Sequence, residues 1–205
     1  MLESRNRKGG AWRLPLAAAA LLVAASSWAQ WELDGAKSAV NFVSIKNASV
    51  AETHGFGSLL GYISADGAVQ LSISLDSVAT SIPIRDQRIR EVLFETVEFP
   101  TATVTAAVDP ALIAAVAGGG TVTTDLPVKV ALHGVEQSLS IPVLVIGEAD
   151  GRLQVFTPQP VLLNAAAFGL AEGIEALREI AGLNSISAAV PVSVRLVFNR
   201  AVATN

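Results

Sequence analysis

Two histidines, His54 and His133, are the side chains of this sequence whose charge can change near neutral pH. His54 comes two positions after Glu52, and a histidine beside a carboxylate could form half of a metal site or serve as a general base. Zinc sites use at least three protein ligands, so this pair is too small. His133 stands where a predicted strand enters a turn, and we expect it to face solvent. The sequence therefore predicts no metal site.

No catalytic motif accompanies these histidines. The sequence contains no cysteine, which excludes disulfides and thiolate metal ligands. Ser185 and Ser187 lie on an alternating segment without a Gly-x-Ser-x-Gly turn, and no glycine-rich phosphate loop joins a strand to a helix. We therefore predict that the protein is not an enzyme and has no catalytic cofactor. An enzyme that uses Glu52 and His54 is the alternative.

Residues 80–99, TSIPIRDQRIREVLFETVEF, interrupt an otherwise weakly charged chain with seven charged side chains. These are Arg85, Asp86, Arg88, Arg90, Glu91, Glu95 and Glu98. Arg88 and Glu91 have the spacing of an ion pair on a helix, which favours a solvated helical face over a catalytic pair of carboxylates. Arg90 is expected to pair with Glu95 in the same way. The segment is predicted to be a short helical connection between strands.

Apolar and polar residues alternate through most of the remaining chain, the pattern of strands that are buried on one face. The predicted strands cover residues 39–46, 58–64, 69–75, 101–108, 122–132, 139–145, 153–156 and 186–198. Further short helices are predicted at 110–116, after an Asp109-Pro110 start, and at 171–183, with Gly182 as a stop. About eight half-buried strands predict an all-β antiparallel barrel or sandwich with one to three short helices.

Residues 1–29 have the composition of a cleavable signal peptide. A basic head is followed by twelve apolar residues, Leu14–Ala25, and by small residues before the end of the segment. Twelve residues are too few to span ~30 Å of hydrocarbon, although an uncleaved anchor is the alternative. Cleavage after Ala29 would leave residues 30–205 as a single exported domain, for which the bacterial periplasm is the predicted location.

The predicted mature chain is acidic. Its 176 residues contain 10 Lys and Arg against 17 Asp and Glu, a net charge of −7. Nucleic-acid binding needs an excess of positive charge facing phosphates, and anionic membranes attract basic surfaces. We therefore expect neither nucleic-acid binding nor stable membrane insertion. The oligomeric state stays open, with a dimer as one option.

The inward-facing positions of the predicted strands are mostly aliphatic. A closed sheet of eight strands has an interior just wide enough for packed side chains or for one small ligand. Valine and isoleucine fill less volume than aromatic residues, which favours a tunnel, with a filled core as the alternative. Residues 89, 93 and 94 are predicted to close it as a lid. The full predicted lining is Phe42, Leu71, Ile73, Ile89, Leu93, Phe94, Val128, Val130, Ile141, Val143, Phe168, Val192, Val194 and Leu196.

The segment with Arg85-Asp86, then Leu93-Phe94-Glu95, then Phe99-Pro100, resembles the signature of the YceI-like family. Other pieces agree with the family in their order along residues 31–198, namely Trp31–Asp34, Ser38–Phe42, Gly55–Gly57, Asp76–Thr80, Leu132–Val135 and Ala167–Leu170. The sequence departs from the family pattern at Arg88, where histidine is common, at Leu93, which replaces a phenylalanine, and at Glu95, near the usual aspartate. Residues 173–183 also replace a shorter loop.

The resemblance implies a single lipocalin-like β-barrel, often periplasmic, whose apolar tunnel holds a polyisoprenoid or similar lipid. The expected function is thus non-catalytic binding of a polyisoprenoid, isoprenoid quinone, fatty chain or similar long apolar chain. Arg85, Arg88 and Arg90 would be available to a head group, or would serve only as partners of nearby carboxylates. A structural or interaction module with a filled core is the alternative, and an outer-membrane barrel is disfavoured because aromatic girdles are missing.

Overall fold

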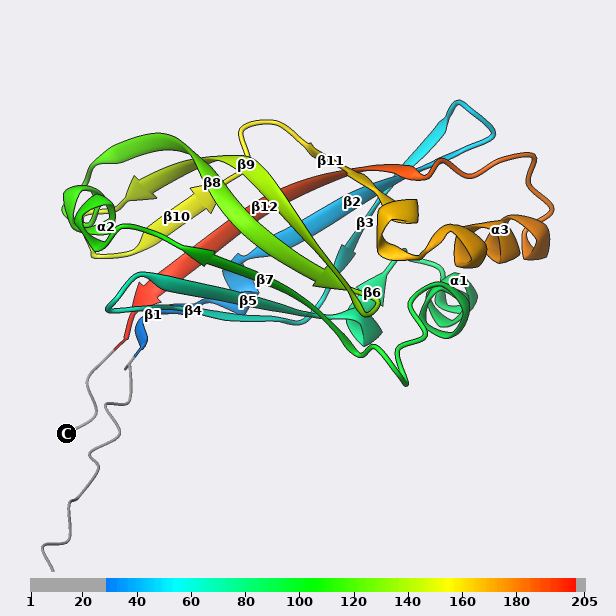
Figure 1. Cartoon of the computed structure of the whole chain (residues 1–205), viewed down its shortest axis with the longest axis horizontal. Coiled ribbons are helices and arrows are strands. Elements are labelled where there is room, and N and C mark those ends of the chain that lie inside the picture. Colours follow the sequence, from blue (N-terminus) through cyan, green and yellow to red (C-terminus); the bar gives the residue numbers. More distant parts are fainter. Residues whose placement is uncertain (1–28, 202–205) are drawn as a thin grey trace, which may run out of the picture.

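The computed structural model describes residues 29–201 (Figure 1). The predicted signal peptide therefore lies outside the described residues, apart from Ala29, which begins the first strand. No helix within the described range is long and apolar enough to cross a membrane.

Eight antiparallel strands form a closed ring, as the sequence predicted. In order around the ring they are β1 (Ala29–Leu33), β4 (Leu59–Ser64), β5 (Ala68–Ser74), β7 (Thr101–Ala107), β8 (Thr121–Leu132), β9 (Val135–Gly147), β10 (Leu153–Phe156) and β12 (Ala189–Arg200). The ring closes because β1 pairs with both β4 and β12. The longest hairpin, β8–β9, turns at His133-Gly134, where both residues have positive φ, as a two-residue type I′ turn requires.

Four further strands extend the wall at one end of this ring. The first half of β12 pairs with β11 (Val161–Asn164) on one side and β2 (Ala39–Lys46) on the other, and β2 continues to β3 (Val50–Phe56) and β6 (Val78–Ala79). Alternation did not predict β3, because it carries Glu52 and His54 on one face, nor β11, because it has only four residues. The wall of the barrel therefore has additional strands at one end that the other end lacks.

Short helices cover the two ends of the barrel (Figure 1). At one end lies α2 (Pro110–Val116), which begins after Asp109, whose side chain accepts a hydrogen bond from the Ala111 amide at 2.8 Å. At the other end lie α1 (Pro83–Arg88), its π-helical continuation η3 (Ile89–Leu93), and α3 (Ala171–Ile180). Three 3₁₀ turns complete the fold, η1 (Gly35–Lys37), η2 (Leu75–Ser77) and η4 (Ala165–Phe168).

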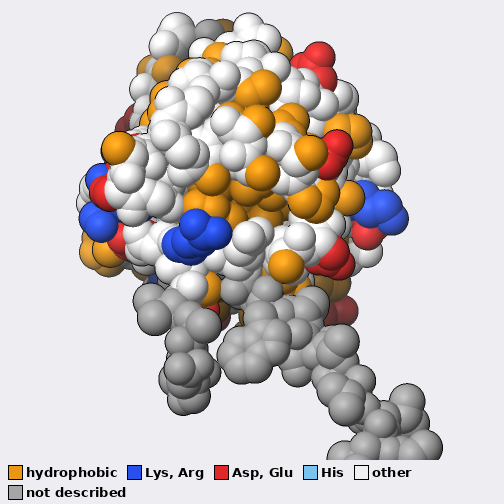
Figure 2. All heavy atoms as spheres, turned by 90° about the vertical axis from the view of Figure 1, so that its left-hand side faces the viewer, with side chains coloured by type: hydrophobic (Ala, Val, Ile, Leu, Met, Phe, Trp, Pro, Cys, Tyr) orange, Lys and Arg blue, Asp and Glu red, His pale blue; other side chains and the backbone are white. Residues whose placement is uncertain are grey.

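The half of the barrel beside α2 is packed with large side chains. Trp31, Leu153 and Phe198 are each only 1% exposed and belong to one apolar core with Ile113 and Val116 of α2. Figure 2 views this end and shows hydrophobic side chains across the middle of the face, with charged ones mostly toward its edges. Trp31, Leu153 and Phe198 do not line the large cavity described below.

The backbone of α2 comes very close to the end of β9. A Cβ atom at Gly147 would lie only 1.6 Å from the Val116 carbonyl oxygen, so only glycine fits at that position. Glycine thus allows α2 to sit directly on the barrel and to complete the packed half.

Candidate ligand-binding cavity

The opposite half of the barrel is hollow. Its cavity has a volume of about 470 Å³, within the range of roughly 300–1,000 Å³ that is usual for ligand sites. Every second residue of the strands points into it, as the pleat requires. The strand residues that line it with apolar side chains are Val40, Phe42, Val43, Phe56, Leu71, Ile73, Ala102, Val104, Val130, Leu132, Leu139, Ile141, Val161, Leu163, Val190, Val192 and Val194.

Two helical segments cover the mouth of this cavity. Ile89, Leu93 and Phe94 line it from the α1–η3 side, and Ile174 and Leu177 line it from α3. Ile89 and Phe94 are buried, so the α1–η3 segment is already packed against the interior. We call residues 83–94 together with α3 the lid.

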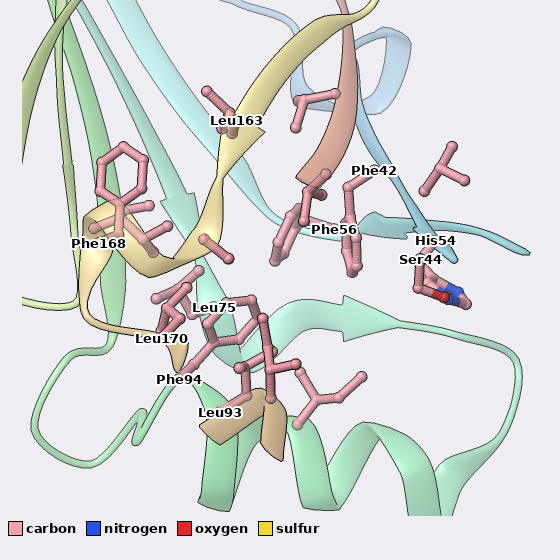
Figure 3. A pocket seen from close by; sticks show the side chains of 18 of the residues that line it. Phe42, Ser44, His54, Phe56, Leu75, Leu93, Phe94, Leu163, Phe168 and Leu170 are labelled. Atoms are coloured by element: carbon pink, nitrogen blue, oxygen red, sulfur yellow. The ribbon is translucent and has the colours of Figure 1, made fainter. Parts of the chain in front are cut away.

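The two halves of the lid touch through their backbones. A Cβ atom at Gly173 of α3 would lie 2.8 Å from the Val92 carbonyl oxygen and 3.0 Å from the Leu93 Cα atom. Glycine at this position lets α3 pack closely on η3. An aromatic row runs inward from the lid, with ring centroids 6.1 Å apart for Phe94 and Phe56 and 5.5 Å for Phe56 and Phe42 (Figure 3).

The structure brings most of the predicted lining residues into one cavity. Those that line it are Phe42, Leu71, Ile73, Ile89, Leu93, Phe94, Val130, Ile141, Phe168, Val192 and Val194. Val128, Val143 and Leu196 do not, although each is buried. They occupy inward positions outside the hollow part of the barrel, so the structure does not bring them into the cavity. Alternation identifies the inward face of a strand and carries no information on where along it the packing ends.

Two groups of missed lining residues have an identifiable cause. Phe56, Val161 and Leu163 lie on β3 and β11, which the sequence pattern did not predict as strands. Ile174 and Leu177 were recognised as one face of a helix, and their three-residue spacing was the available signal, but nothing in the sequence placed that helix over the barrel.

One end of the cavity is polar. Ser44 and Lys46 of β2, His54 of β3, and Arg85 and Arg88 of α1 contribute to the lining there. The chemistry of this end depends on which of these groups already have partners within the protein.

Glu52 forms ion pairs with two of the cations. Its carboxylate pairs with the Lys46 ammonium group and lies 2.6 Å from Nη1 of Arg85. The hydrogen bond from Lys46, and then that from Arg85, hold the pKa of Glu52 below its ordinary value despite some desolvation. Glu52 is therefore an anionic partner of two cations and does not form a metal site with His54. The described chain contains no cluster of three or more possible metal ligands.

Each of the three side-chain nitrogens of Arg85 donates to a protein group. Besides Glu52, its Nε donates to the Thr80 hydroxyl at 2.8 Å and its Nη2 to the Thr80 carbonyl oxygen at 2.6 Å. The Thr80 amide in turn donates to Asp86 at 2.8 Å. Arg85 thus connects α1 to β3 and uses three of its five N–H donors within the protein.

The other two arginines of the lid, Arg88 and Arg90, differ in their position relative to the cavity. Arg88 lines the cavity, whereas Arg90 does not. Within residues 29–201 neither side chain has an ion-pair partner. The predicted pairs of Arg88 with Glu91 and of Arg90 with Glu95 were therefore wrong. α1 passes into a π-helical turn at residue 89, which changes the spacing of side chains along the surface.

The carboxylates of the lid region have other partners. Glu91 accepts a hydrogen bond from the Gln87 side chain at 2.9 Å, and Glu95 lies 2.8 Å from Nε2 of His133. The His133 ring is also 4.5 Å from that of Phe99, and its side chain is only 15% exposed. The prediction that His133 faces solvent was wrong, because it fastens the β8–β9 turn to the segment after the lid.

His54 is a buried polar residue in the wall of the cavity. It is 4% exposed, its Nε2 lies 2.8 Å from the Ser44 hydroxyl, and its Nδ1 has no hydrogen-bond partner in the described chain. Burial, and next the nearby Arg85 charge, lower the pKa of His54 below its ordinary value. The imidazole is therefore neutral at pH 7.

A closed eight-stranded barrel that is packed at one end and hollow at the other defines a lipocalin-like protein, a class with room inside for one small ligand. The chain belongs to the YceI-like family, because the model of the YceI-like domain matches residues 31–198. This confirms the resemblance drawn from the sequence. Among curated proteins, none matches the chain.

Solved structures agree with this assignment. A polyisoprenoid binding domain from Saccharophagus degradans, implicated in plant cell wall breakdown, is 40% identical, with a TM-score of 0.82; the match covers 85% of this chain and 100% of that domain. BcnA from Burkholderia cenocepacia is 21% identical, with a TM-score of 0.61 and coverage of 80% and 98%. The YceI protein of Campylobacter jejuni has 13% identity, a TM-score of 0.50 and coverage of 77% and 90%. The last two matches support the fold alone.

Proposed function

We propose that the protein is a non-catalytic periplasmic binding protein that holds a polyisoprenoid, an isoprenoid quinone or a similar long apolar chain, and so stores or transports it. The observation that carries this proposal is the cavity of about 470 Å³, whose lining is apolar along the barrel strands and beneath the lid. The Saccharophagus degradans domain, 40% identical over its whole length and described as polyisoprenoid binding, supports the same ligand class.

The expected affinity comes mainly from burial of the chain. Each buried CH₂ group contributes about 0.8 kcal/mol before the cost of ordering the ligand. A chain of many carbons could thus bind tightly with few polar contacts. The cavity also argues against the alternative of a module with a filled core, because that alternative requires large side chains where Val130, Val192 and Val194 stand.

Native mass spectrometry of protein purified without detergent tests the proposal. We expect a complex heavier than the polypeptide, and solvent extraction should release a long-chain lipid. A variant with tryptophan at a cavity position, Val194→Trp, should be recovered without that mass. Wild-type protein that always appears at the mass of the bare polypeptide, and does not take up an added isoprenoid, would contradict the proposal.

Export is tested separately. Protein recovered from the periplasmic fraction should begin at Gln30 if the signal peptide is removed after Ala29. An N-terminus at Met1, or recovery only with the membranes, would contradict the proposed location without affecting the ligand proposal.

A further inference from the structure

The cavity occupies only part of the length of the barrel. In the described chain, the ring strands β1, β4 and β10 contribute no residue to its lining. Figure 1 shows that β12 runs from the end that α3 covers toward the opposite end, so its inward residues follow the barrel along its length. Val190, Val192 and Val194 line the cavity, whereas Leu196 and Phe198, which lie further along, do not. The cavity therefore ends inside the barrel.

The same change occurs on all five ring strands that line the cavity. On each of them, the last inward residue of the lining is followed, two positions deeper in the barrel, by an inward residue that does not line it. The last lining residues are Leu71, Val104, Val130, Ile141 and Val194, and the deeper ones are Val69, Ala106, Val128, Val143 and Leu196. The deeper five are buried or packed against the apolar core. We call them the floor of the cavity.

A second hollow, on the flank of β7 and β8, does not extend the cavity. It is lined by Ala106 and Val128 of the floor together with the exposed residues Thr105, Lys129 and Ser138. Its exposed lining shows that it opens at the surface. A chain that crossed the floor on this side would therefore meet polar side chains and water.

The lid bounds the cavity at the other end. Ile174 and Leu177 of α3, and Leu183 after it, contribute apolar side chains there, and Ile89 and Phe94 are buried beneath the lid. A chain that lies between the lid and the floor is surrounded by apolar side chains. Carbons that extend beyond the lid would face water.

The distance from lid to floor follows from the number of residues along the wall. The lining extends from Val40 to Lys46 on β2, and from Ser187 to Val194 at the start of β12, which are six and seven residue steps. At about 3.3 Å per residue, these segments are about 20 and 23 Å long. Barrel strands tilt by about 40°, which leaves about 15–18 Å along the axis. An extended chain advances about 1.2 Å per bond, so about three to four isoprene units fit.

The volume of the cavity leads to the same length. An apolar cavity of about 150 Å³ holds one benzene molecule, so a cavity of about 470 Å³ holds, in proportion, about 19 carbons. Because the volume and the length agree, the space is filled by one extended chain and leaves no room for the chain to fold back.

We propose that the lid and the floor set the length of the ligand, so that the protein selects apolar chains of three to four isoprene units over longer polyprenyl chains. This inference rests on the proposed function and narrows its ligand class. Each unit beyond the limit must lie outside the cavity, where it loses the apolar surroundings that stabilise the rest of the chain.

Transfer from a bilayer tests this preference. Phosphatidylcholine vesicles with equal amounts of all-trans prenols of three to seven isoprene units are incubated in excess with the protein, and mass spectrometry of a solvent extract measures the prenols that the protein holds. An enclosed unit exchanges one apolar environment for another, whereas a unit outside the cavity leaves hydrocarbon for water. Loading should therefore be highest at three or four units and at least ten-fold lower at six.

Two variants should move this limit in opposite directions. Leu196→Ala removes part of the floor and should shift the maximum toward longer chains. Val194→Phe fills the deepest part of the cavity and should shift it toward shorter ones. It adds a ring to empty space, so it tests the limit even if Leu196→Ala does not fold. Leu153→Ala is the matched control, because Leu153 pairs with Phe198, one inward position further from the cavity than Leu196; it should keep the wild-type maximum.

The possible outcomes separate this inference from the proposed function. Loading that rises or stays level up to seven units would overturn the inference and leave the proposed function intact. A maximum that neither floor-side variant moves would also overturn it, because the floor would then not set the limit. If the protein takes up no prenol of any length, the proposed function itself fails.

Discussion

The two halves of the barrel interior are built on the same strands but are filled differently. Beside α2, Trp31 and Phe198 are 1% exposed, and Ile113 and Val116 of α2 are buried in the same apolar core. Beside α1 and α3, the inward positions of the same long strands carry valine, leucine and isoleucine, and a cavity of about 470 Å³ remains. The comparison indicates that one half supplies stability and leaves the other half free to bind a ligand.

The largest expected effect is the loss of a side chain from the packed half. Phe198→Ala should lower the free energy of unfolding by about 3–5 kcal/mol, since Phe198 is 1% exposed and its removal opens a void. Chemical denaturation measures the change. A loss below ~1 kcal/mol would mean that this half is not the stable core. Phe168→Ala, which only enlarges an existing cavity, is the comparison and should cost less.

A second prediction separates the two halves along a single strand. Val130 lines the cavity, whereas Val128, two residues away on the same face of β8, does not. Val130→Trp should abolish uptake of a fluorescent lipid with little loss of stability, because the new ring enters empty space. Val128→Trp should destabilise the fold by roughly 1–3 kcal/mol through overpacking. Equal effects on binding and stability at both positions would contradict the division of the interior.

The third prediction concerns the lid. Gly173→Ala places a Cβ atom 2.8 Å from the Val92 carbonyl oxygen, so α3 must move away from η3. We expect a loss of stability of roughly 0.5–3 kcal/mol and faster release of bound ligand, which stopped-flow displacement can follow. Gly118→Ala, where a Cβ atom meets nothing within 4 Å, is the matched control. Unchanged release in Gly173→Ala would show that the lid does not limit exchange.

The smallest expected effect is a pH dependence that arises in the hollow half. The pKa of His54 is lowered in the folded protein, first by burial and then by Arg85. Below about pH 6.5, the ordinary pKa of histidine, the unfolded chain takes up a proton that the folded chain does not, so the free energy of unfolding decreases as the pH falls. The pKa of Glu52 is also lowered in the folded protein. The stability that Glu52 contributes is lost only when its carboxylate is protonated, which happens at more acidic pH.

Denaturation of the wild type and of His54→Phe between pH 7.5 and 5.5 measures this effect. The wild type should lose more stability than the variant over this range. Parallel pH profiles for the two proteins would mean that His54 is not desolvated as the structure indicates.

Much of the fold was predictable because period-two alternation is a local property. The β8 and β9 strands, the Asp109-Pro110 start of α2 and the stop at Gly182, whose φ is +63°, were all recognised from neighbouring residues. By contrast β3 was missed, because its inward face carries Glu52 and His54 in place of apolar residues. The rule that buried faces are apolar fails where a polar site faces the interior.

The candidate site was predictable only in part, because ion pairing is decided across the fold. Arg85 pairs with Glu52, which is 33 positions away in the sequence, and Glu95 pairs with His133, which is 38 positions away. A helical surface pattern considers only near neighbours, so it could not find these distant partners.

The sequence by itself determined most of the strands, their inward faces and the apolar character of the interior, because alternation and side-chain volume are encoded residue by residue. Only the tertiary structure decided that Val130 meets a cavity and Val128 does not, that α3 covers the mouth, and that His54 keeps a free nitrogen inside. Empty space and unpaired atoms depend on what the rest of the chain fails to fill, and that is settled only when all the elements have packed together.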